Sequence, residues 1–263
     1  MHSLIDILGL DRQGVISIIG AGGKTSLMFH LAREISLKAR TVLTTCTTKI
    51  MMPEKEQSPH TVIAGSLGEL LEKSRSGLTR FHHLTAAERQ DPDTGKLTGF
   101  QPLTIDRLHQ ASCFDWIIVE ADGAKRKPLK ATDTHEPVVP ATTTHLVLVT
   151  GLDAVGLTLD DHHVHRAGIF SQTTGLPLGA PVDERSIAAS AVRELKKAAA
   201  LPFPPLTFIL LNKADTPERV NSGRTIAGLC KYKKIVNRVI VASLKDTNPV
   251  RVWFDCNAVD DEG

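Results

Sequence analysis

A run of small residues followed by a lysine and a threonine lies near the start of the chain, and its composition suits a loop that binds phosphate. The run consists of Gly20, Ala21, Gly22, Gly23, Lys24, Thr25 and Ser26. Glycines lack a Cβ and allow positive φ, so backbone N–H groups can turn toward phosphate oxygens. A helix that starts here adds unpaired N–H groups and the positive end of its dipole. We therefore predict that the run binds a nucleotide, with Lys24 on the β- and γ-phosphates and Thr25 on Mg²⁺.

The flanking residues predict a strand before this loop and a helix after it. Residues 15–19 form a short β-branched run, which is typical of a buried strand. Leu27, Met28 and Leu31 follow at helical spacing. The common P-loop pattern G-x-x-x-x-G-K-[ST] requires glycine where the chain has Ile18. The shorter pattern G-x-G-G-K-T resembles the loop of Mur-type ligases.

Two carboxylates follow a second apolar strand, which we predict at residues 116–119. Glu120 and Asp122 both lie where P-loop enzymes have the acid that holds Mg²⁺ or its waters. We favour Glu120 for the metal shell, together with Thr25, and keep Asp122 as the competing ligand. The spacing Glu120-x-x-Gly123 is also that of GTPase-like sequences in which the glycine N–H contacts the γ-phosphate. The candidate catalytic residues are Lys24, Glu120 and Asp122.

A candidate base-recognition motif follows the apolar strand predicted at residues 208–211. Asn212, Lys213 and Asp215 form the pattern N-K-x-D, which binds guanine in GTPases. The carboxylate of Asp215 would accept hydrogen bonds from guanine N1–H and the exocyclic amine. Adenine offers no such pair of donors, so the carboxylate would remain unpaired. We therefore expect GTP to be preferred over ATP, and residues 242–244 are a candidate second base-side loop.

Three further polar clusters each have a functional and a structural interpretation. The threonine-rich residues 44–49 are either a switch segment near the γ-phosphate or simply the end of a strand. The basic residues after the acidic pair either bind an anionic substrate or form a solvated loop. The histidine cluster lacks Cys or Glu at metal-ligand spacing, and we expect an exposed loop there. The basic residues are Lys125, Arg126, Lys127 and Lys130, and the histidines are His162, His163 and His165.

Apolar strands alternate with helical segments along the chain, which indicates a mainly parallel sheet covered on both faces. We therefore predict an α/β fold, the three-layer sandwich of P-loop NTPases. A turn at residues 91–95 indicates a small hairpin-like insertion at about residues 80–100. We expect one nucleotide-binding domain over residues 1–247 and a poorly ordered tail over residues 248–263.

Composition excludes several functional classes for this 263-residue chain. A net charge of +2 with interspersed signs and only 4% aromatic residues argue against nucleic-acid binding. Four scattered cysteines without a C-x-x-C pair indicate reduced thiols. We find no signal peptide and no membrane-spanning apolar segment, so we expect a cytoplasmic protein without membrane contacts.

These motifs together resemble one family, the selenium-dependent hydroxylase accessory proteins of the YqeC type. The resemblance covers roughly residues 10–245, and Glu120-Ala-Asp122-Gly123 is its most distinctive part. It implies a nucleotide-binding protein that assists the maturation of selenium-dependent molybdenum hydroxylases, with a client hydroxylase or its cofactor as partner. Cys46 interrupts a threonine run of the family. The matching segments are residues 20–26, 44–49, 119–130, 136–140, 151–156, 164–166 and 212–215.

Three functions remain open at this point. The first is a Mg²⁺-dependent triphosphatase that prefers GTP, uses water as nucleophile and stabilises the transferring phosphoryl group through Lys24. The second is an ATP-dependent kinase or ligase that acts on a small anionic substrate. The third is a chaperone that binds a nucleotide or a pterin without catalysis.

Overall fold

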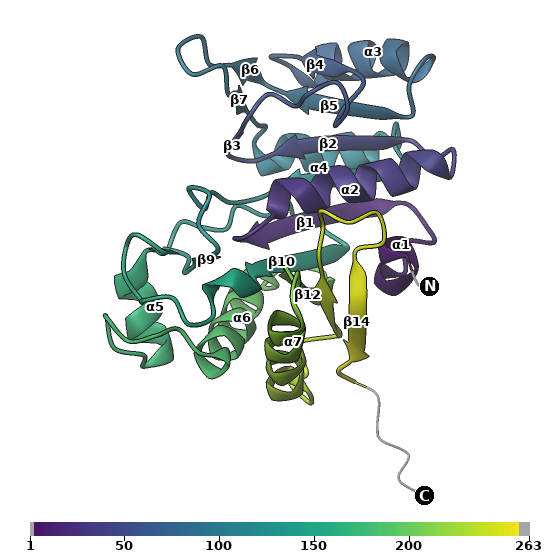
Figure 1. Cartoon of the computed structure of the whole chain (residues 1–263). Coiled ribbons are helices and arrows are strands. Elements are labelled where there is room, and N and C mark those ends of the chain that lie inside the picture. Colours follow the sequence, from purple (N-terminus) through teal and green to yellow (C-terminus); the bar gives the residue numbers. More distant parts are fainter. Residues whose placement is uncertain (1–2, 258–263) are drawn as a thin grey trace, which may run out of the picture.

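The computed structural model describes residues 3–257, which form an α/β fold around one nine-stranded sheet (Figure 1). The order of the strands is β14-β13-β12-β10-β1-β8-β2-β5-β4, and all neighbours are parallel except β13 and β14. The strands are β1 (Gly14–Gly20), β2 (Val42–Cys46), β4 (Thr61–Ile63), β5 (His83–Ala87), β8 (Trp116–Glu120), β10 (His145–Gly151), β12 (Leu206–Asn212), β13 (Arg238–Ala242) and β14 (Val250–Asp255).

Helices cover both faces of this sheet, which confirms the predicted three layers (Figure 1). Alternate residues of β1 point to opposite faces, and Ile16 and Ile18 pack against α1 and α2. On the other face α6 and α7 cover the half that contains β10 to β13, while α3 and α4 cover the half that contains β8 to β4. The helices are α1 (Leu4–Leu8), α2 (Lys24–Leu37), α3 (Leu67–Leu78), α4 (Pro102–Gln110), α5 (Ala167–Thr174), α6 (Glu184–Ala198) and α7 (Pro217–Cys230), with a 3-10 turn at Leu152–Ala154.

Two small sheets lie beside the main one. The first is antiparallel, in the order β3-β7-β6, and the second pairs β9 with β11 in parallel. Their strands are β3 (Lys49–Ile50), β6 (Arg89–Gln90), β7 (Leu97–Thr98), β9 (Leu129–Lys130) and β11 (Val164–His165). The hairpin predicted around residues 91–95 is therefore present between β6 and β7.

The first part of the predicted insertion belongs to the main sheet instead. Residues 83–87 form β5, which pairs with β2 and β4, because Leu84 and Ala86 are buried against α3 and α4. The strand β14 lies within the expected tail and was not predicted from the sequence. This strand forms the antiparallel edge of the sheet, and the rest of that tail, residues 258–263, lies outside the described residues.

None of the helices between residues 3 and 257 has the length and apolar character that crossing a bilayer requires.

Candidate functional site

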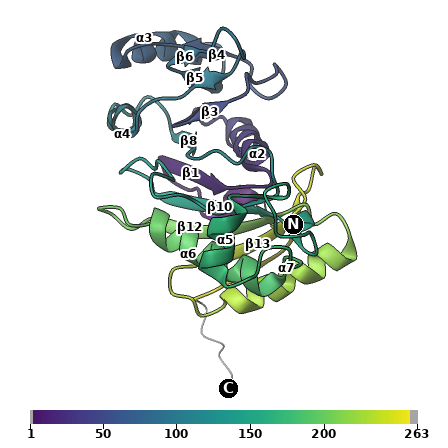
Figure 2. The same cartoon turned by 90° about the vertical axis from the view of Figure 1, so that its left-hand side faces the viewer.

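The glycine-rich loop lies where β1 ends and α2 begins, and Figure 2 shows the molecule from that side. Gly22 and Gly23 have φ of +79° and +136°. A Cβ on Gly22 would lie 2.3 Å from the Gly151 nitrogen, and one on Gly23 would lie 2.2 Å from Asn212 Nδ2. Both glycines are therefore required by backbone conformation and by close packing. Among the described residues no side chain caps α2, so its first N–H groups are available to a ligand.

A pocket of about 530 Å³ opens above this loop and has a strongly basic lining. Residues 22–26 form its floor, and Glu120 contributes the one acidic side chain of the lining. A concentration of positive charge beside a helix N-terminus suits a multiply charged anion such as a triphosphate. The basic lining residues are Lys24, Lys49, Lys96, Lys125, Arg126, Lys127 and Lys213.

Lys24 is buried at the base of this pocket and makes three polar contacts within the protein. Its Nζ donates a hydrogen bond to the Gly20 carbonyl at 2.8 Å. The same nitrogen lies 3.1 Å from Asp122 Oδ1 and 3.7 Å from Glu120 Oε1. The ammonium group is therefore held against both acidic residues predicted for the site.

Glu120 and Thr25 meet directly at the pocket wall. The Thr25 hydroxyl donates a hydrogen bond to Glu120 Oε2 at 2.7 Å. Burial raises the pKa of Glu120 above its ordinary value, although Lys24 and the Thr25 hydroxyl act in the opposite direction. A hydroxyl beside a carboxylate supplies the hard oxygen donors that Mg²⁺ prefers. Between residues 3 and 257 no group of three or more His, Cys, Asp and Glu side chains could hold a metal by itself. Mg²⁺ would therefore need phosphate oxygens and waters as further ligands.

Asp122 has a different environment, because it lies beneath the loop and not on the pocket wall. Its side chain is fully buried, and Oδ2 accepts a hydrogen bond from the Gly20 N–H at 2.9 Å. The same oxygen accepts a hydrogen bond from Lys130 Nζ at 2.9 Å. Asp122 thus fixes the start of the glycine loop, which favours Glu120 over Asp122 as the residue nearer a metal.

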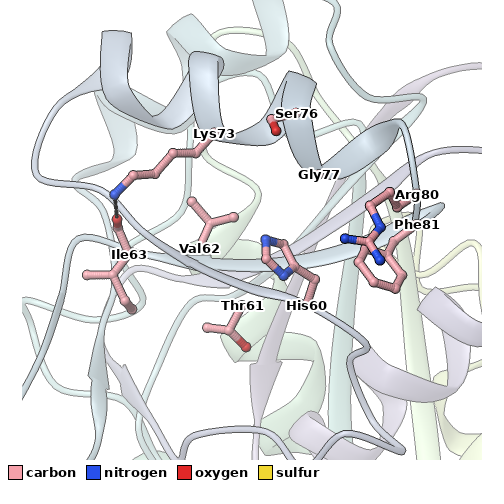
Figure 3. Close-up of a pocket in the computed structure, with 9 residues that line it drawn as sticks. All are labelled: His60, Thr61, Val62, Ile63, Lys73, Ser76, Gly77, Arg80 and Phe81. Atoms are coloured by element: carbon pink, nitrogen blue, oxygen red, sulfur yellow. Dashed lines mark hydrogen bonds between the residues drawn. The ribbon is translucent and has the colours of Figure 1, made fainter.

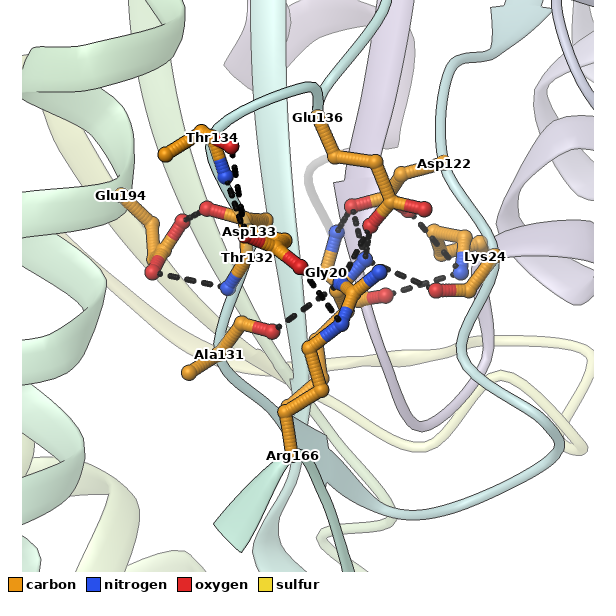
Figure 4. A network of polar contacts seen from close by, with 12 residues as sticks. Gly20, Lys24, Asp122, Ala131, Thr132, Asp133, Thr134, Glu136, Arg166 and Glu194 are labelled. Atoms are coloured by element: carbon orange, nitrogen blue, oxygen red, sulfur yellow. Dashed lines mark hydrogen bonds and ion pairs between the residues drawn. The ribbon is translucent and has the colours of Figure 1, made fainter. Parts of the chain in front are cut away.

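Lys130 continues a chain of alternating charges away from the pocket. Figure 4 shows Asp122, Glu136 and Arg166 of this chain. Besides Asp122, its Nζ donates to the Gly123 carbonyl at 2.7 Å and to Glu136 Oε2 at 2.9 Å. Arg166 donates to the same Glu136 oxygen at 2.6 Å. Burial would raise the pKa of Glu136, but hydrogen bonds from Arg166 and Lys130 lower it to about 2. We call Lys24, Asp122, Lys130, Glu136 and Arg166 the charge network.

Sequence patterns indicate no role for Glu136 or Arg166, although both lie in segments of the family resemblance. Their contact depends on β9 and β11 pairing side by side, which brings residues thirty positions apart together. Neither residue belongs to a pattern with a known chemical role. Their place in the segments of the family resemblance, residues 136–140 and 164–166, was the available signal.

The candidate base-side residues lie together at the ends of β12 and β13. Asn212 Nδ2 donates to the Gly22 carbonyl at 2.8 Å, and its Oδ1 accepts from the Leu244 N–H at 3.0 Å. The Ser243 hydroxyl donates to Asp215 Oδ1 at 2.7 Å. Asp215 Oδ2 lies 3.2 Å from Lys245 Nζ. We call Asn212, Asp215, Ser243 and Lys245 the Asn212 cluster.

The hydrogen bond from Ser243, together with Lys245, lowers the pKa of Asp215. Asp215 is therefore an ionised acceptor near neutral pH. Lys213 has φ of +64° and pairs with Asp153 at 2.7 Å, so it lines the phosphate pocket rather than contacting Asp215.

The histidine cluster and a second cavity lie outside this pocket. His163 pairs with Asp160 at 2.9 Å. A cavity of about 590 Å³ between β4 and α3 is lined by residues such as His60, Lys73 and Phe81 (Figure 3). It lies near the β4 edge of the sheet and contains no carboxylate among its lining residues. We therefore place the candidate functional site at the glycine loop.

Comparison with known proteins gives a family match and distant likenesses to solved structures. The model of a family described as YqeC protein matches residues 16–168. A relative from Escherichia coli (strain K12), described as "Uncharacterized protein YqeC", is 35% identical over 183 residues. That match covers 66% of this chain and 65% of the relative's length, so it spans about two thirds of each protein.

The solved structures include two FtsY proteins at low identity. Chloroplast FtsY from Physcomitrella patens is 17% identical, with a TM-score of 0.44, over 95% of this chain and 64% of that chain. FtsY from Mycoplasma mycoides is 13% identical, with a TM-score of 0.41, over 94% of this chain and 64% of that chain.

Proposed function

This chain belongs to the YqeC family, and from that premise we propose that it is a Mg²⁺-dependent nucleoside triphosphatase that prefers GTP. One observation supports the proposal above all others. Asn212 donates directly to the Gly22 carbonyl, so the candidate base-binding loop and the candidate phosphate-binding loop are physically joined. A single nucleotide could therefore contact both loops at once.

The pocket contains the groups that phosphoryl transfer to water requires. On nucleotide binding, Lys24 would exchange its carboxylate partners for β- and γ-phosphate oxygens. Thr25 and Glu120 would hold Mg²⁺, which neutralises charge on the phosphates when it is bound. The Gly123 carbonyl accepts from Lys130, which fixes the orientation of the peptides beside the expected γ-phosphate. These residues would stabilise the transferring group while water attacks it.

The preference for guanine is proposed from Asp215. Its carboxylate is ionised and is positioned by the Ser243 hydroxyl. Guanine offers two N–H donors to such an acceptor, whereas adenine leaves it unpaired. On nucleotide binding, Lys245 would have to give up part of its contact with Asp215.

The biological setting is proposed from the family resemblance. It is the cytoplasmic maturation of a selenium-dependent molybdenum hydroxylase, with the hydroxylase or its cofactor as partner. That residues 1–247 form a single nucleotide-binding domain also remains a proposal, and β14 adds residues 250–255 to the sheet of that domain. A kinase or ligase acting on an anionic substrate is the second candidate, and the basic lining of the pocket favours it. A chaperone that binds nucleotide or pterin without turnover is the third.

Calorimetric titration with Mg-GTP and Mg-ATP tests the proposal. We expect the wild-type protein to bind GTP more tightly and to hydrolyse it, and Lys24→Ala to lose at least about tenfold in affinity. Lys55→Ala, an exposed lysine outside the pocket, serves as the control, with a melting curve for each variant. Equal affinity in folded wild type and Lys24→Ala would reject the phosphate-binding assignment.

A further inference from the structure

The basic pocket extends beyond the glycine loop, away from the Asn212 cluster. Strand order places β12 and β13 on one side of β1, and β8 and β2 on the other. Lys49 lies three residues after β2 ends, and β3 pairs with β7 next to Lys96. A nucleotide whose base contacts Asp215 and whose phosphates contact Lys24 would therefore leave this far side of the pocket open.

Three cations that line the pocket have no ion pair with any described residue, and they are Lys96, Lys125 and Arg126. Their neighbours are already paired: Lys49 lies 2.9 Å from Asp91, and Lys127 donates to the carbonyls of Asp161 and Val164. Unpaired like charges around one pocket repel each other and lower the cost of binding an anion there. Lys24 lies on the floor of the pocket. Its role in binding the nucleotide phosphates therefore does not explain why further cations line the walls.

The backbone of the loop that carries two of these cations is also unusual. Lys125 and Arg126 both have positive φ, +49° and +60°, a conformation that is costly for residues with a Cβ. The loop is held in place because the Gly22 N–H donates to the Lys127 carbonyl at 3.1 Å and the Gly151 N–H to the Pro128 carbonyl at 2.9 Å. The strained pair is therefore fixed directly beside the glycine loop, and strain of this kind concentrates at ligand sites.

We propose that Lys96, Lys125 and Arg126 bind a second ligand, a small molecule that bears a phosphate group, next to the γ-phosphate position of the nucleotide. Two ammonium groups and a guanidinium fork suit a dianionic phosphate better than a singly charged carboxylate. This inference rests on the proposed function for the position of the nucleotide. It adds a co-substrate site to a pocket that triphosphate hydrolysis alone would leave partly unused.

The test uses the full chain saturated with Mg²⁺ and a β,γ-imido analogue of GTP, so that the γ-phosphate position is occupied. Inorganic phosphate is the probe, titrated at constant ionic strength, with acetate as the carboxylate arm. Backbone amide shifts of residues 95–97 and 124–127 report binding. We expect saturable shifts with phosphate and weaker ones with acetate. Lys96→Gln and Arg126→Gln should each weaken phosphate binding about threefold, and the double variant about tenfold.

Lys55→Gln is the matched control, and it should bind phosphate as the wild type does. The inference is overturned if residues 95–97 and 124–127 do not respond, if acetate binds as tightly as phosphate, or if the pocket variants match the control. A parallel titration without the analogue separates the two proposals. If the analogue itself does not bind, the proposed function fails, while phosphate shifts at these same amides still decide the second site.

Discussion

The charge network and the Asn212 cluster both hold the glycine loop, but they do so in opposite environments. The charge network reaches the loop through Asp122, which accepts from the Gly20 N–H. The Asn212 cluster reaches it through Asn212, which donates to the Gly22 carbonyl. The side chains of Asp122 and Lys130 are 0% and 1% exposed, whereas those of Asp215 and Lys245 are 23% and 65% exposed.

This difference determines what each region contributes. Removing one partner of a buried ion pair leaves an uncompensated charge away from water, which is strongly destabilising. Removing one partner of an exposed pair costs little, because solvent replaces it. We therefore expect the charge network to set the stability and shape of the site, and the Asn212 cluster to set its selectivity.

The largest effect is expected from Lys130→Met. This change leaves buried Asp122 with one cation fewer and frees the Gly123 carbonyl, so the free energy of unfolding should fall by about 3–5 kcal/mol. Urea unfolding measures it, with Lys245→Met as the exposed counterpart, for which we expect a loss below about 1 kcal/mol. Similar losses in both variants would remove the distinction between the two regions.

Glu120→Gln should reduce Mg²⁺-dependent turnover by about 10–100-fold while changing nucleotide affinity much less, because the residue acts on the metal shell. Asp122→Asn should instead lower the melting temperature, since it weakens the contact with Lys24 and Lys130. Both variants are assayed over a range of Mg²⁺ concentrations. A selective loss of the Mg²⁺ response in Asp122→Asn would show that the metal role belongs to Asp122.

Acid should weaken the charge network through Glu136. Its pKa in the folded protein is about 2, below the ordinary value of 4.5. The carboxylate therefore contributes stability above pH 4.5, and this contribution is lost as pH falls from 4.5 toward 2. Glu136→Gln should remove up to about 2 kcal/mol of stability near neutral pH, because partial exposure limits the effect.

Urea unfolding at about pH 7 and about pH 3 checks this expectation for Glu136. The difference in stability between wild type and Glu136→Gln should shrink at the lower pH. The contribution of Glu120 to stability depends on pH in the opposite direction, because its pKa is raised in the folded protein. That contribution is largest below pH 4.5 and becomes weaker as pH rises. A difference between wild type and Glu136→Gln that stays constant with pH would contradict the assignment.

The smallest effect is expected at Asp215, and it concerns selectivity rather than stability. GTP should bind about tenfold more tightly than ATP, as one charge-assisted hydrogen bond implies. Asp215→Asn should reduce that preference and shift it toward XTP, whose additional carbonyl accepts from the amide. Competition binding of the three nucleotides measures it, with Arg224→Gln, an exposed arginine of α7, as the control. Tighter ATP binding by the wild type would favour the kinase or ligase.

The sequence predicts the parts of this site that are local. Strand, glycine loop and helix follow one another without interruption, and α2 begins at Lys24 as expected. The predicted strands before Glu120 and Asn212 are also present. The contact between residues 212–215 and residues 242–244 was expected only from their common position at strand ends.

The parts that sequence patterns did not reveal depend on distant contacts. Asp122 had the spacing of a metal ligand, but its burial beneath Gly20 follows from how β1 and β8 pair. The partnership of Glu136 and Arg166 requires β9 and β11 to meet. The strand at residues 250–255 has alternating, half-exposed positions, and only its pairing with β13 distinguishes it from a tail.

The position of β1 in the middle of the sheet has a consequence for biosynthesis. Its two neighbours are β8 and β10, whose residues are synthesised about a hundred positions later. The first strand to leave the ribosome therefore cannot acquire β8 until nearly half of the chain has been made, or β10 until more than half has been made. Asn212 completes the glycine loop later still. Contacts this distant in sequence slow folding and leave apolar strands exposed meanwhile. We expect the nascent chain to need protection until β12 emerges.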